Sequence, residues 1–169
     1  MSERVLVAVA HGSADPRAAA TINELMAVAA TRTAARGLSM RAAYLGHAAP
    51  SLPQVVSALP ADAQVTVLPL LLTAAYHSKT DMPRVLARLR GDFPWLDLTC
   101  GPTLGPHPLL LRGLERRLAE AVPDAFEDPG RTGVVLAAAG SSDPAANATI
   151  GRLAARWQAR AGWFAVRPA

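Results

Sequence analysis

Short runs of apolar and β-branched residues alternate with helix-like segments along most of this chain. The strand-like runs occupy residues 5–9, 40–45, 65–72 and 96–100. The first helix-like segment places Ile22, Leu25 and Met26 on one helical face. Strands that alternate with helices form βαβ units around a mainly parallel sheet. We therefore predict an α/β fold in which helices flank a mainly parallel sheet with the flavodoxin-like strand order 2-1-3-4.

One part of this pattern occurs twice. Residues 140–144 are Gly-Ser-Ser-Asp-Pro, and they match residues 12–16, which are Gly-Ser-Ala-Asp-Pro. Further matches follow at the same offset, and such self-similarity indicates an internal duplication. The copies differ at one position that matters chemically, because His11 in the first copy corresponds to Ala139 in the second.

The duplication predicts how the chain is organised. We expect a complete first unit at 1–122, a linker at 123–132 and a partial second unit at 133–169. The second unit reaches only the start of its second strand, so the chain is either a piece of a longer protein or ends there naturally. Its apolar residues lack a complete sheet to cover, so they must pack on the first unit, pack on a second chain or stay partly disordered. We therefore expect self-association, as a two-fold homodimer.

Charge and cysteine content narrow the functional class. The formal net charge is +4, from 17 Lys and Arg against 13 Asp and Glu. Basic residues such as Arg84 and Arg88 fit solvated helix faces and are not interleaved with aromatic residues, which argues against a nucleic-acid partner. No apolar segment approaches the ~20 residues of a membrane span, and the first residues do not form a signal peptide. The single cysteine, Cys100, fits a reducing compartment, so we predict a cytoplasmic protein without a membrane partner.

Two histidines that follow strand-like runs are the main candidates for chemistry. His11 ends the first run, and His77 lies in the loop after the third. The first and third strands are neighbours in the predicted order and lie ~4.8 Å apart, so both imidazoles would face one crevice. Imidazole is a good ligand for iron, cobalt, nickel or zinc, and it accepts protons near neutral pH. Two histidines are too few for a closed structural metal site, which typically has about four ligands.

Several other residues leave alternatives open. His47 also ends a strand-like run, and it is either a further metal ligand or a loop residue. The turn of Gly12 and Ser13 before a helix could hold a phosphate, but it lacks the full glycine pattern of a phosphate loop. Ser13 also lacks the glycine elbow that surrounds a hydrolase nucleophile. Asp81 and Cys100 have simpler interpretations, as a helix N-cap and a small core residue.

Three segments carry a family resemblance. They are Val-Ala-His-Gly-Ser at 9–13, Pro-Leu-Leu-Leu-Thr-Ala-Ala-Tyr-His at 69–77 and Gly-Pro-Thr-Leu-Gly-Pro-His-Pro-Leu at 101–109. Together they resemble the sirohydrochlorin chelatase family, of the CbiX and SirB type. The resemblance implies a chelatase-like fold with duplicated α/β halves. Long members of that family are two fused units with the active site in one half, which matches His11 opposite Ala139.

The resemblance also implies a reaction and a set of site residues. The enzyme would be a lyase that inserts divalent iron or cobalt into sirohydrochlorin, in sirohaem or cobalamin biosynthesis. His11 and His77 would be the catalytic residues and metal ligands. His47 is not part of these family motifs, and it stays a candidate for a further ligand on its position alone. The residues expected around the tetrapyrrole are Gly12, Ser13, Arg17, Tyr76 and Lys79. The metal is a substrate, for which nickel is also suited, and we expect no permanently bound cofactor.

One position departs from the family pattern. Family members commonly carry a Glu near the end of the second strand, where this chain has Gly46. The adjacent His47 is a candidate to compensate for this Glu, although strand alternation would point its side chain the other way. The missing carboxylate and the partial second unit keep a second function open, that of a carrier that binds a tetrapyrrole or metal without inserting it.

Overall fold

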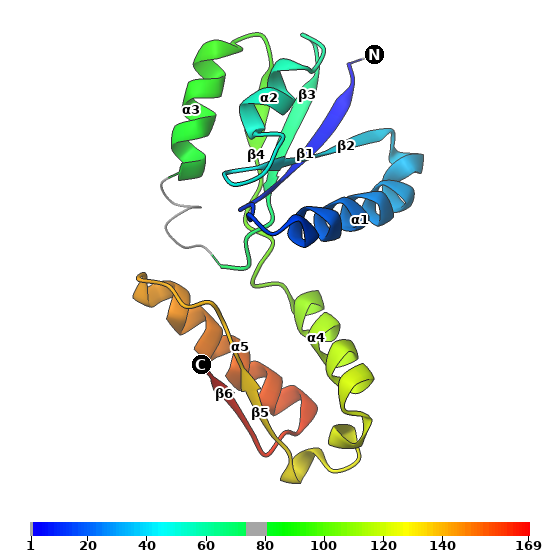
Figure 1. Cartoon of the computed structure of the whole chain (residues 1–169), viewed down its shortest axis with the longest axis vertical. Coiled ribbons are helices and arrows are strands. Elements are labelled where there is room, and N and C mark those ends of the chain that lie inside the picture. The colour runs from blue at the N-terminus through cyan, green and yellow to red at the C-terminus, as the bar shows by residue number, and fades with distance from the viewer. Residues whose placement is uncertain (1, 74–80) are drawn as a thin grey trace. The chain divides into compact units, whose positions relative to one another are not determined.

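The computed structural model describes residues 2–73 and 81–169, and these form two compact units. Among the described residues, the first unit contains those up to Leu104 except Thr73, and the second contains Thr73 and the residues from Gly105 onward (Figure 1). In the part of the chain that the structure describes, none of the helices has the length and apolar character that crossing a bilayer requires.

The first unit is built around a parallel sheet. Its elements are β1 (Arg4–Ala10), α1 (Pro16–Thr33), β2 (Leu38–Tyr44), α2 (Leu52–Ser57), β3 (Gln64–Pro69), α3 (Met82–Asp92) and β4 (Asp97–Cys100). The strand order is β2-β1-β3-β4, and each pairing within this sheet is parallel. The predicted α/β fold and its strand order are therefore confirmed.

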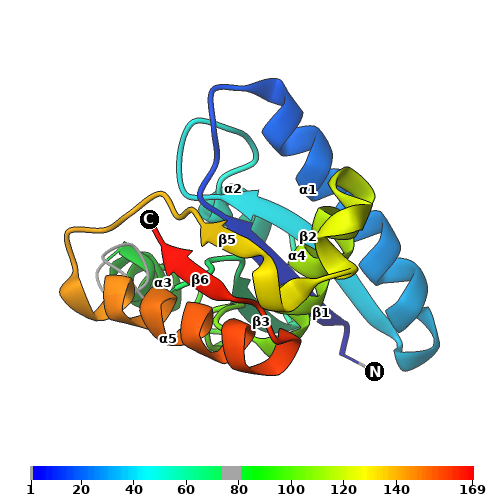
Figure 2. The same ribbon diagram turned by 90° about the horizontal axis from the view of Figure 1, so that it is seen from below.

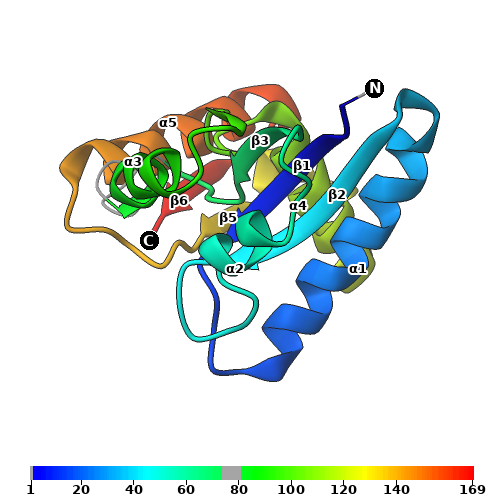
Figure 3. The same cartoon turned by 90° about the horizontal axis from the view of Figure 1, so that it is seen from above.

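Valines at alternating positions of β1 and β3 form the centre of this unit's core. Val7 and Val67 are fully buried and pack in one cluster with Leu52 of α2 and Leu86 of α3. Figure 3 shows α1 on the opposite side of the sheet from α3, beside β2. Helix α1 contains no buried residue, and Leu25 of its predicted apolar face is 47% exposed. The prediction that Cys100 is a core residue is wrong, because its side chain is exposed at the end of β4.

The second unit combines one helix from the predicted first unit with the repeated segment. Its elements are α4 (Pro108–Ala121), two 3-10 helices (Pro123–Phe126 and Pro129–Arg131), β5 (Gly133–Leu136), α5 (Pro144–Ala161) and β6 (Ala165–Pro168). Strands β5 and β6 pair in parallel, and α5 runs alongside them (Figure 2). Leu111 of α4 is buried in one cluster with Trp157 and Trp163.

This packing divides the chain at a different place from the sequence prediction. A break was expected between 122 and 133, whereas the compact units divide at residue 104. The physical reason is that the apolar residues of α4 are buried together with α5 and β6. The predicted linker is itself folded, with the Phe126 ring centroid 5.0 Å from that of Trp163. The apolar residues of the repeated segment thus find cover on α4, which belongs to the predicted first unit.

The internal duplication is visible in the local geometry. Helices α1 and α5 both have 18 residues and begin at the two matching prolines. The turn before each helix contains a glycine with positive φ, 89° at Gly12 and 75° at Gly140. An aspartate then caps each helix, since Asp15 accepts a hydrogen bond from the Arg17 backbone N–H at 3.0 Å and Asp143 accepts one from Ala145 at 2.9 Å. The same short sequence therefore folds twice into the same strand–turn–helix.

The joining of α4 to α5 yields a stability prediction. Trp157 is only 3% exposed, and its indole N–H donates to the Glu115 carboxylate of α4 at 2.9 Å. Replacing Trp157 with Phe should cost about 1–2 kcal/mol of unfolding free energy, because it removes a hydrogen bond to a charged acceptor. Urea unfolding followed by circular dichroism measures this. The matched control is Trp95→Phe, at a side chain 58% exposed, which should change stability by less than about 0.5 kcal/mol. Equal effects of the two changes would show that the contact between α4 and α5 contributes little.

Candidate functional site

An open pocket of about 430 Å³ lies at the carboxyl edge of the sheet in the first unit. Its lining residues are His11, Leu45, Gly46, His47, Asp81, Arg84 and Val85. They come from the segments that follow β1 and β2 and from the start of α3. Parallel α/β sheets bind their ligands at this edge, so the pocket lies where the fold predicts one.

The segments after β1 and β2 are held together by their backbones. The Leu45 N–H donates to the Ala10 carbonyl at 3.0 Å, and the Gly46 N–H donates to the His11 carbonyl at 3.1 Å. Gly12 continues this close approach with a φ of 89°. A Cβ atom at position 12 would lie 1.7 Å from the Gly46 carbonyl oxygen, so a side chain there would push the two segments apart. Glycine at this position is therefore what allows His11 to stand beside the end of β2.

His47 faces His11 across this junction. The two ring centroids are 6.4 Å apart and the ring planes differ by 21°. Strand alternation does not apply to His47, because β2 ends at Tyr44 and the φ of His47 is 58°. The expectation that alternation points His47 away from the site is wrong for this reason. Because the backbone turns after β2, both imidazoles line one pocket.

This pair of imidazoles can hold a metal ion weakly and can move protons. The described residues contain no group of three or more His, Cys, Asp or Glu side chains placed to hold a metal ion. The described part of the site is thus unlike a closed structural centre, and an ion held by two imidazoles can be passed on. His11 Nδ1 lies 3.2 Å from the Gly12 carbonyl oxygen. In the tautomer that donates from Nδ1 to this oxygen, Nε2 carries the lone pair that binds a metal or accepts a proton.

The other predicted site residues have mixed outcomes. His77, Tyr76 and Lys79 lie outside the described residues, so their predicted roles remain predictions. The Ser13 hydroxyl accepts a hydrogen bond from the Asp15 N–H at 3.1 Å, which gives Ser13 a structural role in the turn.

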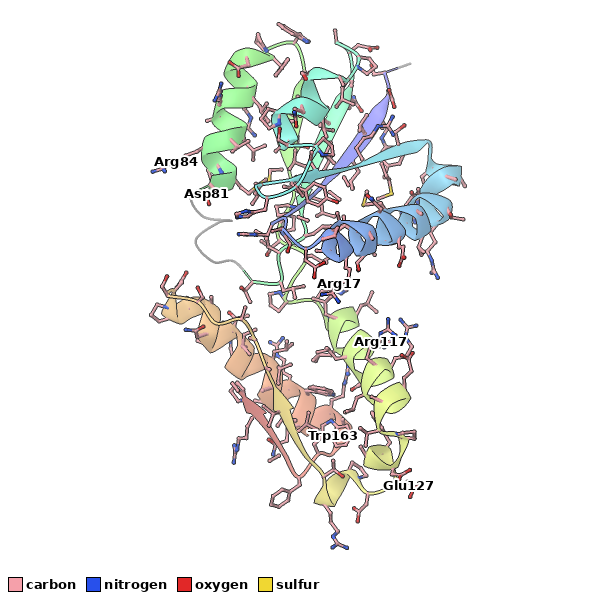
Figure 4. The ribbon with its side chains drawn as sticks, viewed as in Figure 1. Arg17, Asp81, Arg84, Arg117, Glu127 and Trp163 are labelled. Carbon is pink, nitrogen blue, oxygen red and sulfur yellow. The ribbon has the colours of Figure 1, made fainter. Side chains whose placement is uncertain are left out.

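Arg17 does not line the pocket, although it was expected around the substrate. Its guanidinium pairs with Asp15, with Nη2 2.6 Å from Oδ2, and both side chains are solvent-accessible. The hydrogen bond from the Arg17 side chain holds the pKa of the Asp15 carboxyl below its usual value. Figure 4 shows Arg17 near the start of α1. The Asp15 carboxylate therefore neutralises the guanidinium that was expected to bind the substrate.

Besides Leu45 and Gly46, three pocket residues at the start of α3 were not predicted as part of the site. Asp81 immediately precedes α3, and Arg84 and Val85 lie in its first turn, so i, i+3 and i+4 spacing places the three residues on one helical face. Asp81 was expected to cap α3, but its backbone is helical and its side chain makes no capping hydrogen bond. Arg84 is exposed, as expected, yet it also borders the pocket (Figure 4). Their position after β3, at the carboxyl edge, was the signal that could have identified them.

The duplicated turn in the second unit lacks the imidazole that His11 provides in the first copy. Ser141 accepts from the Asp143 N–H at 3.1 Å, as Ser13 accepts from Asp15. Ala139 stands where His11 does in the first copy, and a methyl group binds no metal. Asn147 instead holds the turn closed, since its side chain accepts from the Ser141 N–H at 3.1 Å and donates to the Ser141 carbonyl at 2.7 Å.

Comparison with known proteins places the chain in a family. A family model described as CbiX matches residues 5–121 of the 169 residues. The chain belongs to the CbiX family. The resemblance found in the sequence is therefore confirmed.

Two curated relatives from Priestia megaterium carry names of chelatases. A sirohydrochlorin cobaltochelatase is 30% identical over 86 residues, which is 51% of this chain and 28% of the relative. A sirohydrochlorin ferrochelatase is 30% identical over 91 residues, which is 54% of this chain and 33% of the relative. The matched part thus spans about a third or less of each relative's length.

Solved structures share the fold. A CbiX protein from Marinobacter aquaeolei VT8, assigned to cobalamin (vitamin B12) biosynthesis, has a TM-score of 0.55 and 26% identity, over 71% of this chain and 98% of that one. SirB from Bacillus subtilis with Fe3+ has a TM-score of 0.74 and 22% identity, over 100% of this chain and 65% of SirB. SirB from Bacillus subtilis subspecies spizizenii in complex with cobalt has a TM-score of 0.69 and 23% identity, over 100% of this chain and 67% of SirB. At the identity of the SirB structures, the similarity shows the fold alone.

Proposed function

We propose that this CbiX-family chain inserts a divalent metal, iron or cobalt, into sirohydrochlorin, and that the metal passes through the pocket at His11 and His47. The observation that carries the proposal is the placement of these two imidazoles, with ring centroids 6.4 Å apart, in an open pocket at the carboxyl edge of the sheet. The names of the curated relatives support the same substrate and the same two metals. The metal ion is a substrate of this reaction.

Metal insertion needs groups that hold an ion weakly and groups that take up protons. The ring gives up two pyrrole N–H protons and receives one divalent ion, so the products are the metallated ring and two protons. His11 and His47 are suited to present the ion, because imidazole nitrogen is a good ligand for both metals. The same nitrogens can then accept protons near neutral pH. We assign His77 as a second catalytic histidine and metal ligand, on the sequence motif alone.

The experiment that tests this function follows insertion by absorbance. Metal-free sirohydrochlorin is mixed with Fe2+ or with Co2+ under anaerobic conditions, with and without the protein. An insertion rate above the uncatalysed rate supports the chelatase. Binding of sirohydrochlorin without any acceleration would instead support the carrier function that the missing family Glu leaves open.

The duplication predicts one metal site rather than two. Calorimetric titration with Co2+ should show one functional site per chain, because Ala139 has replaced the histidine in the second copy. His11→Ala should abolish that site or weaken it at least about tenfold, since one of the imidazole ligands is then removed. Two equivalent sites, one of them near Ser141, would contradict the assignment of the second copy as a segment without metal chemistry.

Two further expectations accompany this function. The cytoplasmic location rests on the single cysteine, and it stays a prediction. The two-fold dimer also stays a prediction, and the side chains of Val135 and Phe164, 68% and 70% exposed in the second unit, are apolar surface that such a contact would cover.

A further inference from the structure

Arg84 is placed differently from the other arginines near the site. It lies in the first turn of α3, it borders the pocket, and its side chain makes no ion pair or hydrogen bond among residues 2–73 and 81–169. Arg17 is paired with Asp15. Arg88, one turn further along α3, is paired with Asp92 at 3.4 Å and lies outside the pocket. Of these three guanidinium groups, that of Arg84 alone is both at the pocket and without a carboxylate partner in the described chain.

The direction of the side chain sets what it can reach. Figure 4 shows Arg84 extending outward from the start of α3, away from the centre of the sheet. Arg84 therefore borders the pocket at its outer rim, while His11 and His47 line the pocket from the segments that follow β1 and β2. A flat ring whose centre faces these imidazoles would present its peripheral groups to that rim. The peripheral groups of sirohydrochlorin are carboxylates.

We propose that Arg84 binds a peripheral carboxylate of the tetrapyrrole and so orients the ring on the two imidazoles. The inference rests on the proposed function, and it makes Arg84 a determinant of substrate specificity. The guanidinium is planar and presents paired N–H donors that match a carboxylate in a bidentate contact. The start of α3 adds the partial positive charge of a helix N-terminus on the same side. Arg84 is the only arginine or lysine among the residues that line the pocket in the described chain.

The test separates binding from chemistry. Arg84→Gln should raise KM for sirohydrochlorin about tenfold and weaken equilibrium binding of the metal-free ring equally, while kcat stays within about twofold. Arg84→Lys keeps the charge without the planar fork and should recover part of the loss. Arg88→Gln is the matched control on the same helix and should change neither KM nor binding. The tetrapyrrole methyl ester serves as an uncharged probe, and wild type and Arg84→Gln should bind it equally.

The outcomes for Arg84 and for the proposed function are distinguishable. Insertion by the wild type together with unchanged KM and binding in Arg84→Gln would overturn the role of Arg84 and leave the function intact. A fall in kcat with unchanged KM would also overturn it, because Arg84 would then act on the chemical step. A wild type that binds sirohydrochlorin without inserting metal would reject the chelatase, and the equilibrium binding of Arg84→Gln would still decide the carboxylate contact. A wild type that does not bind sirohydrochlorin at all would overturn both.

Discussion

Replacing His11 with alanine should lower the rate of metal insertion about 100-fold or more and leave the fold intact. The imidazole supplies both a ligand for the incoming ion and an acceptor for a pyrrole proton, and loss of a positioned proton acceptor typically costs about 10²–10⁴ in rate. The side chain of His11 is exposed and belongs to neither hydrophobic core cluster, so its removal opens no cavity. Anaerobic insertion kinetics measure the rate, and circular dichroism checks the fold.

A matched histidine elsewhere in the chain controls for nonspecific effects. His107 is exposed and caps α4 through its Nδ1 atom, which accepts from the Leu109 N–H at 3.2 Å. His107→Asn keeps an oxygen that can cap the helix and should insert metal at the wild-type rate.

His47→Ala should also slow insertion if the two imidazoles act together. Wild-type rates in a folded His11→Ala, His77→Ala double variant would reject the assignment of both residues.

Replacing Gly12 with alanine should cost roughly 3 kcal/mol of unfolding free energy and also slow metal insertion. A non-glycine residue in this left-handed conformation costs about 1–2 kcal/mol. The added methyl group also overlaps the Gly46 carbonyl, 1.7 Å from the Cβ position, and such overpacking costs about 1–3 kcal/mol. The overlap is with backbone, so it is relieved only by moving the segments that carry His11 and His47 apart. Urea unfolding and insertion kinetics measure the two effects.

The duplicated turn provides a control for Gly12. Gly140 has a similar φ of 75°, but among the described residues no heavy atom beyond its own chain neighbours lies within 4 Å of the position of its Cβ. Gly140→Ala should therefore cost only the conformational part, about 1–2 kcal/mol, and leave insertion unchanged. The difference between the two substitutions isolates the close approach at Gly46. Equal losses of stability from both would mean that the contact between Gly12 and Gly46 relaxes without cost.

Much of the fold follows from local patterns in the sequence. The buried valines of β1 and β3 and the Asp-Pro pairs at residues 15–16 and 143–144 predict strands and helix starts that the structure contains. The duplication was readable because a positive-φ glycine and a capping aspartate recur at a constant offset. The position of α4 could not be predicted from the sequence. An amphipathic pattern shows that one face of a helix is buried, but it does not show which unit buries that face. Leu111 found its partners in Trp157 and Trp163, far along the chain.

The candidate site divides in the same way. The sequence alone determined the family, the sheet and the presence of a histidine at the carboxyl end of β1, because these depend on local motifs and on strand–helix alternation. Only the tertiary structure decided that His47 faces His11, since this depends on where β2 ends and on a positive φ that no periodicity predicts. It also decided which arginine borders the pocket. Arg17 and Arg84 cannot be told apart by residue type. The tertiary structure pairs Arg17 with the Asp15 carboxylate and places Arg84 at the rim of the pocket.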